Sequence, residues 1–69
     1  MGKRAMTADD ASKMFPVGTR VKYFPIFGED KHEEAEIRSE AWALGHGELV
    51  IKITGRAGGV AISHLELND

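Results

Sequence analysis

The chain has no cysteine, few aromatic residues and no long apolar stretch, and each absence narrows what it can be. Without cysteine there is neither a disulfide framework nor a thiolate metal site, which suits a reducing compartment. The uninterrupted apolar stretches are only a few residues long, whereas a membrane-spanning helix needs about 20. Residues 1–14 also lack the apolar core of a signal peptide. We therefore expect a cytoplasmic protein that makes no membrane contact.

The chain is also too short for more than one small domain. A domain of 69 residues buries only about 60% of the surface that its unfolded chain exposes, so we expect no deep substrate cavity. We divide the chain into an N-terminal segment, residues 1–15, that is partly disordered or forms a short helix, and a domain over residues 16–69. Thr7 and Asp10 have the spacing of a helix cap.

Alternating apolar residues predict β-strands through most of the domain. Apolar side chains recur at every second position, which is the period of a half-buried strand. Strands are expected over residues 19–24, 35–44, 48–54 and 60–63. Glycine-rich turns at 45–47 and 55–59 supply the backbone freedom that tight hairpins need. These features together predict an all-β fold, a small antiparallel barrel of about five strands.

The same alternation predicts the core and singles out one aromatic residue that does not fit. Trp42 has the parity of charged residues in its strand, so either a bulge at 39–41 changes the register or Trp42 lies on the outer surface. Residues 64–67 are expected to form a single turn that closes one end of the barrel. The predicted core consists of Val21, Ile37, Leu49, Ile51, Ile53, Val60, Ile62 and Leu65.

The order of these features resembles the small SH3-like barrels. The signal is a glycine followed by a basic and apolar strand, Gly18-Thr19-Arg20-Val21, then a charged excursion, a long strand and two tight hairpins. A closing segment follows, with Gly59-Val60-Ala61-Ile62 and then Leu65-Glu66. The resemblance covers about residues 17–67 and implies a shape without a particular activity, because such folds carry many functions.

Among proteins of that shape, the plasmid-borne type II dihydrofolate reductases begin and close in a similar way. The resemblance implies oligomerisation, because these enzymes act only as tetramers around a shared pore. A Val-Gln-Ile-Tyr segment lines their pore, and the matching segment here is Val60-Ala61-Ile62-Ser63. Alanine and serine lack the groups that would contact folate and nicotinamide. An oligomeric reductase is therefore the third of three functional hypotheses.

The first hypothesis rests on the uneven placement of charge. Between Glu29 and Glu40 six acids stand against two bases, a balance of −4, while the remainder of the chain carries +2. This stretch includes the longest connection, and loops on a rigid scaffold carry function disproportionately. We predict a protein-binding site whose acids speed association and whose aromatics supply affinity, for a partner with a basic patch or a second copy of the chain. Its predicted residues are Phe27, Glu29, Asp30, Glu33, Glu34 and Trp42.

The second hypothesis is nucleic-acid binding by a modest basic face. Basic residues share a strand face with an aromatic side chain on which a base can stack. The acidic stretch opposes this hypothesis, because it repels phosphates unless it points away. The residues of this alternative are Arg20, Lys22, Phe24, Lys52 and Arg56.

Neither catalysis nor a cofactor is expected. His32, His46 and His64 lie in three separate connections, without the paired short spacing of zinc ligands. The carboxylates crowd into one polar stretch, whereas acid–base catalysis needs carboxylates in contrasting environments. The segment 55–59 has the composition of a phosphate-binding loop but lies between two strands rather than before a helix. The sequence therefore predicts a small non-enzymatic binding module that holds no metal.

Overall fold

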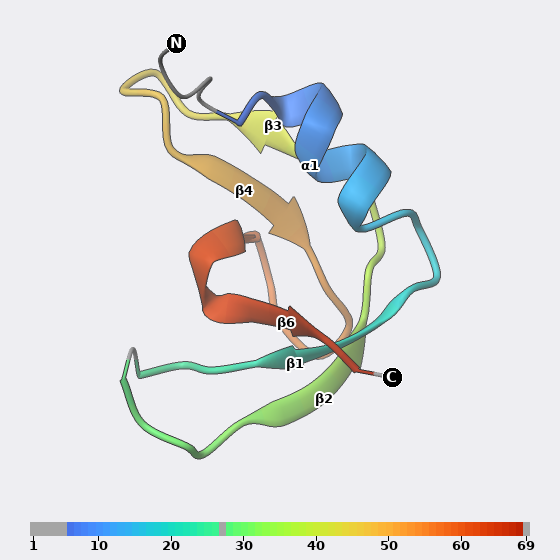
Figure 1. Cartoon of the computed structure of the whole chain (residues 1–69), viewed down its shortest axis with the longest axis vertical. Helices are drawn as coiled ribbons and strands as arrows, with labels where there is room; N and C mark the ends of the chain where they lie inside the picture. The colour runs from blue at the N-terminus through green and yellow to red at the C-terminus, as the bar shows by residue number, and fades with distance from the viewer. Residues whose placement is uncertain (1–5, 27, 69) are drawn as a thin grey trace, which may run out of the picture.

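Six short strands and one helix make up the computed structural model, which describes residues 6–26 and 28–68. Figure 1 shows helix α1 packed beside strand β3 at one end of the molecule and strands β1 and β2 at the other. The elements in chain order are α1 (Ala8–Met14), β1 (Arg20–Tyr23), β2 (Glu33–Glu36), β3 (Trp42–Ala43), β4 (Leu49–Lys52), β5 (Gly59–Ala61), the 3₁₀ helix η1 (Ile62–His64) and β6 (Leu65–Leu67).

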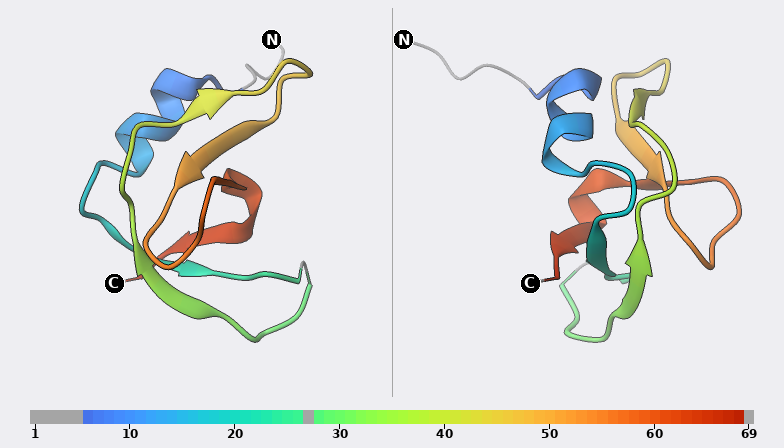
Figure 2. Two further views of the ribbon diagram at one scale, coloured as in Figure 1. Left: turned by 180° about the vertical axis from the view of Figure 1, so that it is seen from behind. Right: turned by 90° about the vertical axis from the view of Figure 1, so that its right-hand side faces the viewer.

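The strands form two antiparallel three-stranded sheets, with the orders β2-β1-β6 and β3-β4-β5. A single bridge between Ile37 and Ile53 joins the segment after β2 to the segment after β4. The two sheets face each other across the core, as the views in Figure 2 show. The prediction of a largely antiparallel β fold with a short helix near the N-terminus is thereby confirmed.

The long strand predicted over 35–44 is two strands in the structure. The ladder is interrupted because a side chain takes the place of a backbone partner: the Lys52 N–H donates to the Ser39 hydroxyl at 3.2 Å. That hydroxyl in turn donates to the Glu40 carbonyl at 3.0 Å. The first piece, β2, begins at Glu33 and so takes in residues that were expected to form a loop. The second piece, β3, begins only at Trp42.

The closing segment also differs from the prediction. The strand expected over 60–63 ends at Ala61, and the single turn occupies residues 62–64. Residues 65–67, which were expected to be that turn, instead form β6 against β1. The amide of Asn68 extends this pairing by donating to the Arg20 carbonyl at 3.0 Å. The apolar spacing of two in Leu65-Glu66-Leu67 is the period of a strand, and the prediction of a turn at 65–67 was wrong because it did not use this spacing.

Six of the eight predicted core residues are buried, and the other two, Leu49 and Ile62, are half-buried and pack against them. The sequence analysis did not place Ala11, Phe15 and Ala41 in the core, although all three belong to it. Ala11 and Phe15 come from α1 and its end, with 0% and 4% of their surface exposed. Helix α1 is therefore part of the packed body of the protein.

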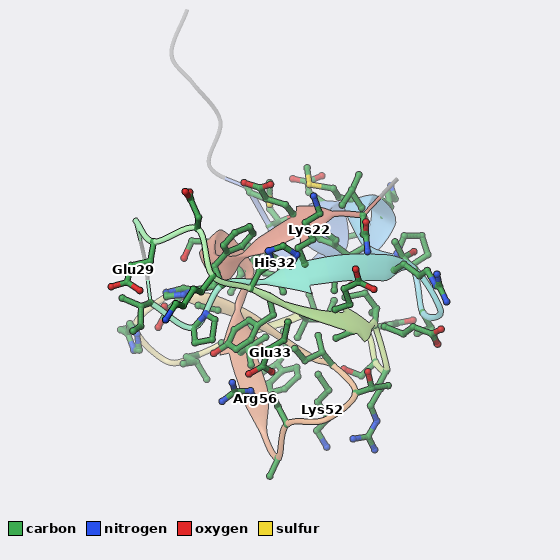
Figure 3. All side chains as sticks on the ribbon, turned by 90° about the horizontal axis from the view of Figure 1, so that it is seen from below. Lys22, Glu29, His32, Glu33, Lys52 and Arg56 are labelled. Atoms are coloured by element: carbon green, nitrogen blue, oxygen red, sulfur yellow. The ribbon has the colours of Figure 1, made fainter. Side chains whose placement is uncertain are left out.

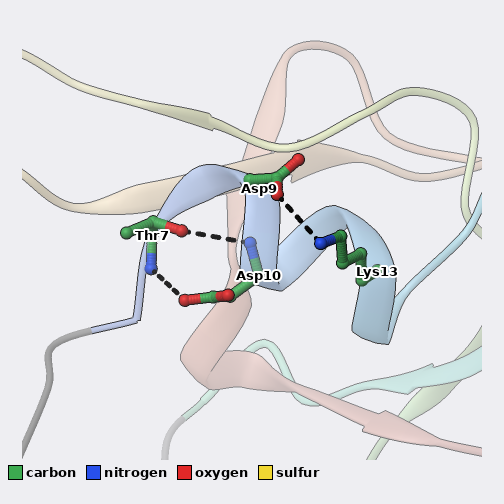
Figure 4. A network of polar contacts seen from close by, with 4 residues as sticks. All are labelled: Thr7, Asp9, Asp10 and Lys13. Atoms are coloured by element: carbon green, nitrogen blue, oxygen red, sulfur yellow. Dashed lines mark hydrogen bonds and ion pairs between the residues drawn. The ribbon is translucent and has the colours of Figure 1, made fainter.

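Helix α1 begins with the predicted cap (Figure 4). The Asp10 N–H donates to the Thr7 hydroxyl and the Thr7 N–H donates to the Asp10 carboxylate, each at 3.1 Å. Lys13 and Asp9 form an ion pair at 3.2 Å, but both side chains are about three-quarters exposed, so this pair contributes little. The hydroxyl of Ser12 accepts the Ala41 N–H at 2.8 Å and ties the helix to the segment before β3.

Replacing Thr7 with alanine is expected to lower the free energy of unfolding by about 1 kcal/mol, because the Asp10 N–H loses its acceptor. Urea denaturation measures the change. Thr7→Ser, which keeps the hydroxyl, is the matched control and should stay close to the wild type. Equal losses in both variants would show that the cap does not act through this hydrogen bond.

No helix within residues 6–26 and 28–68 is long and apolar enough to cross a membrane.

Candidate functional site

An open pocket of about 230 Å³ lies beside the connection between β1 and β2. The connection turns back on itself where the Glu29 N–H donates to the Ile26 carbonyl at 3.1 Å. Ile26 follows Pro25 and keeps 59% of its surface exposed, although it is a large aliphatic residue. The lining is mostly apolar, with carboxylates around it. The pocket is lined by Pro25, Ile26, Glu29, Lys31, His32 and Glu33.

Aromatic rings support one side of this pocket. The rings of Phe24 and His32 lie 5.3 Å apart at a tilt of 43°. The Nδ1 atom of His32 lies 3.3 Å from the Asp30 carbonyl oxygen. His32 is thus held between a ring and a backbone oxygen of its own connection. This contact positions the imidazole as part of the pocket wall.

Arg56 fastens the β4–β5 hairpin to the same region (Figure 3). Its Nη2 donates to the Glu33 carboxylate at 2.8 Å, and its guanidinium carbon lies 4.8 Å from the centre of the Tyr23 ring. Glu33 and Tyr23 are direct cross-strand partners, so one arginine contacts both members of a pair. The His64 ring lies 6.3 Å from the same tyrosine ring. Arg56 therefore joins the hairpin of the second sheet to the edge of the first.

The His64 ring holds the start of the connection. Its Nδ1 lies 2.6 Å from the Phe24 carbonyl oxygen, and the Phe24 N–H donates to the His64 carbonyl at 2.9 Å. These two contacts make Phe24 and His64 continue the β1–β6 pairing beyond the strands. These contacts therefore hold the start of the β1–β2 connection, which lines the pocket, against the end of the sheet.

The structure separates Trp42 from the acidic residues predicted to share its site. Glu29, Asp30, Glu33 and Glu34 belong to the β1–β2 connection and to β2, whereas Trp42 lies in the other sheet, toward the opposite end of the view in Figure 1. The predicted site residues therefore come from different sheets. Phe27, the other predicted aromatic of the site, lies outside the described residues.

Trp42 lies on the outer face of its sheet. The parity of its strand had left two possibilities, a bulge at 39–41 or a position on the outer surface, and the structure shows the second. It is 37% exposed and lies opposite Val50 in the register. A Cβ atom built on Gly59 would lie 2.8 Å and 3.0 Å from two carbons of the indole and 3.2 Å from the Cβ of Val50. The indole therefore lies across Val50 and Gly59. Val50 is 6% exposed without belonging to the central core, which this cover explains.

The residues of the nucleic-acid hypothesis do not form one face. Lys22 lies directly between Glu34 of β2 and Glu66 of β6, and Arg20 lies opposite Glu36. Arg56 is on the other side of the first sheet, beside Glu33, as Figure 3 shows.

Lys52 and Phe24 do not complete a basic face with Arg20 and Lys22. Lys52 is in the second sheet, opposite Gly59. Phe24 packs against His32. Because each cation of the first sheet has carboxylates beside it, phosphates would meet little net positive charge there.

The three histidines lie in different elements, although His32 and His64 both contact Phe24. His32 is in the β1–β2 connection, His46 is in the turn after β3, 3.4 Å from the Glu48 carboxylate, and His64 ends η1. Across the ranges that the structure describes, no group of three or more histidine, cysteine, aspartate or glutamate side chains is placed to hold a metal ion.

Sequence reasoning missed the apolar part of the site. Pro25 and Ile26 were not among the predicted binding residues, and His32 was considered only as a metal ligand. The available signal was an aliphatic residue directly after a proline, next to the densest group of acids in the chain. Comparison of the chain with protein-family models, with curated proteins and with solved structures found no match.

Proposed function

We propose that this chain is a small SH3-like binding module without catalytic activity, and that its β1–β2 connection binds a basic, partly apolar segment of a protein partner. The SH3-like assignment is supported by the order in which the strands follow one another. The Ile37–Ile53 bridge links the two sheets into the sequence β6-β1-β2, then β3-β4-β5, and a 3₁₀ turn precedes the last strand.

The observation that carries the proposal is the apolar pocket with carboxylates on its rim. An exposed aliphatic side chain such as Ile26 offers a partner apolar area to bury. The exposed carboxylates of Glu29 and Glu33 lie around it, with Asp30 in the same connection. Carboxylates at the rim attract a basic segment and raise its association rate, while the apolar centre supplies most of the affinity.

The shape of the pocket favours a peptide over a small metabolite. Sites for small molecules are concave and enclose most of the ligand. This pocket is small and open, and a strand edge runs beside it. An extended or turning segment can place one apolar side chain against Ile26 and a lysine or arginine beside Glu29. Lys31 on the same rim restricts how many basic residues such a segment carries.

The test is a titration of the ¹⁵N-labelled full chain with a short synthetic peptide of alternating arginine and leucine, followed by amide chemical shifts. We expect shifts confined to the amides of the connection and β2, with an affinity that falls as salt is added. Replacing Ile26 with serine should weaken binding about tenfold, because it removes roughly 1.4 kcal/mol of apolar contact. Val17→Ser is the matched control, because Val17 is 63% exposed but lies in a different connection.

The result can go against the proposal in two ways. An equal loss in Ile26→Ser and Val17→Ser would show that the pocket is not the binding surface. A mixed-sequence oligonucleotide is titrated in parallel with a glutamate–leucine peptide. If either of these shifts the same amides as the basic peptide does, the site has no preference for a basic partner.

A further inference from the structure

Strand β5 has an open edge. The Leu44 N–H donates to the Glu48 carbonyl at 2.8 Å, which fixes the alternation of hydrogen bonds along the β3–β4 pair. It follows that Val50 exchanges its hydrogen bonds with Trp42, and that Ile51 exchanges its own with Val60 of β5. The N–H and C=O groups of Gly59 and Ala61 must then point away from β4. The Ala61 carbonyl, as the N-cap of η1, already accepts the first hydrogen bond of that helix. Outside the helices and strands, no hydrogen bond between described residues reaches the other three groups.

The other three edge strands are protected. Strand β2 carries Glu33, Glu34 and Glu36, and β6 carries Glu66 at its middle position. The edge of β3 is occupied by α1, whose Ser12 hydroxyl accepts the Ala41 N–H. Charged side chains and covering elements are the usual means by which proteins prevent edge-to-edge pairing.

Within the part of the chain that the structure describes, β5 pairs with β4 alone and its other edge has neither kind of protection. Its sequence is Gly59-Val60-Ala61, and the whole run from residue 57 to 63 carries no charge. An uncharged edge with free backbone groups is a template for pairing with another strand.

We propose that β5 pairs with β5 of a second copy of this chain, antiparallel about a two-fold axis at Val60. The backbone spacing is self-complementary. Gly59 and Ala61 of one copy stand opposite Ala61 and Gly59 of the other, which gives one six-stranded sheet across the dimer. The Ala61 N–H of each copy donates to the Gly59 carbonyl of the other, and the Gly59 N–H shares the opposite Ala61 carbonyl with η1. This inference is independent of the function proposed for the β1–β2 connection.

The side chains on both faces of β5 suit this pairing. On the outer face only the small residues Gly59 and Ala61 meet across the axis, with the Trp42 indole beside them. On the inner face the two copies of Val60 meet, next to the half-buried Ile62 and Leu49. A second copy therefore extends the apolar layer of the first. The net charge of −2 per chain opposes the pairing only weakly.

The backbone of Ala61 allows a substitution that tests the pairing with little disturbance of the monomer. Ala61 has φ −68° and ψ 134°, and proline fixes φ near −65°. Its N–H points away from β4, so Ala61→Pro removes a hydrogen bond between copies and none within the chain. Ala61→Ser keeps the N–H and is the matched control.

Sedimentation equilibrium of the full chain from about 1 µM to about 1 mM covers the affinities expected of such a pairing. We expect a reversible dimer for the wild type and for Ala61→Ser. We expect a roughly 30-fold weaker dimer for Ala61→Pro, because the two hydrogen bonds donated by the Ala61 N–H groups are lost. A wild type that stays monomeric at all concentrations overturns the proposal. A dimer that Ala61→Pro leaves unchanged also overturns it, since the copies then meet elsewhere.

Amide hydrogen exchange keeps the proposal testable if the proline variant folds poorly. In the wild type, exchange of the Gly59 and Ala61 amides should slow as the protein concentration rises. The Gly47 amide, which donates to the Leu44 carbonyl within the β3–β4 turn, should not change. Concentration-independent exchange at both β5 amides excludes pairing through this edge.

Discussion

Replacing Phe15 with alanine should lower the free energy of unfolding by about 3–5 kcal/mol, the cost of emptying a buried aromatic site. Phe15 is 4% exposed and belongs to the central cluster, although it lies at the end of a helix of only seven residues. Helices this short are not stable alone, so α1 depends on this anchor and on Ala11. Chemical denaturation followed by tryptophan fluorescence measures the change, with Trp42 as the single reporter.

Met14→Ala is the matched control for this experiment. Met14 is the neighbouring residue and a large apolar one, but it is 47% exposed, so its truncation should change stability by no more than about 0.5 kcal/mol. If Phe15→Ala does not fold, Phe15→Leu gives a smaller loss that can be measured. Similar effects at positions 14 and 15 would contradict the view that α1 is part of the core.

The same substitution also tests the predicted division of the chain into an N-terminal segment, residues 1–15, and a domain, residues 16–69. A boundary after residue 15 separates Phe15 and Ala11 from residues 16–69, yet both lie in the cluster that contains Val21 and Ile51. A helix this short must dock to be stable, and the sequence offers Ala11, Met14 and Phe15 as the apolar residues that can do so. A seven-residue helix has too few turns for an apolar stripe to select among them, and the structure buries Ala11 and Phe15 while Met14 stays exposed.

Strand periodicity predicted the core well because it reports a local property. Alternation in 49–53 and 60–62 follows from the pleat of a single strand and needs no knowledge of its neighbours. The break in the long second strand depends on a contact distant in sequence, the Lys52 N–H bound to the Ser39 hydroxyl. The parity of Trp42 indicated that something unusual occurs there, and the structure places the residue on the outer face.

The acidic residues have a second role that their sequence clustering did not suggest. Glu33, Glu34 and Glu36 lie along the edge strand β2, so their charges protect that edge from pairing. Glu33 also lines the pocket and binds Arg56. Residues 29–40 were treated as one charged stretch, but the structure distributes their charges over the β1–β2 connection, strand β2 and the segment before β3. Sequence position alone does not show that division, because it depends on the pairing of β2 with β1.

The outer face of the second sheet provides the other large expected effect. Trp42→Ala should lower the free energy of unfolding by about 2 kcal/mol, roughly half the cost for a fully buried tryptophan, because 37% of the side chain is already exposed. Gly59→Ala should cost about 1–2 kcal/mol, since the new methyl group would lie 2.8 Å from the indole. The loss of unfolding free energy in the double variant should be about 1 kcal/mol smaller than the sum of the two single losses. The reason is that the methyl group added at position 59 no longer meets an indole.

Circular dichroism during urea denaturation measures all four proteins of this cycle, since two of them lack the tryptophan. Gly58→Ala is the control for backbone strain without a side-chain clash. Gly58 has φ 74°, and no atom lies within 4 Å of a Cβ added there. The destabilisation it causes should therefore be the same with and without Trp42. Additive losses in the Trp42 and Gly59 variants would mean that the indole does not lie across Gly59. In that case Trp42 would be available to a partner, as the sequence-based prediction of a binding site assumed. Coupled losses identify it as the cover that keeps Val50 from water.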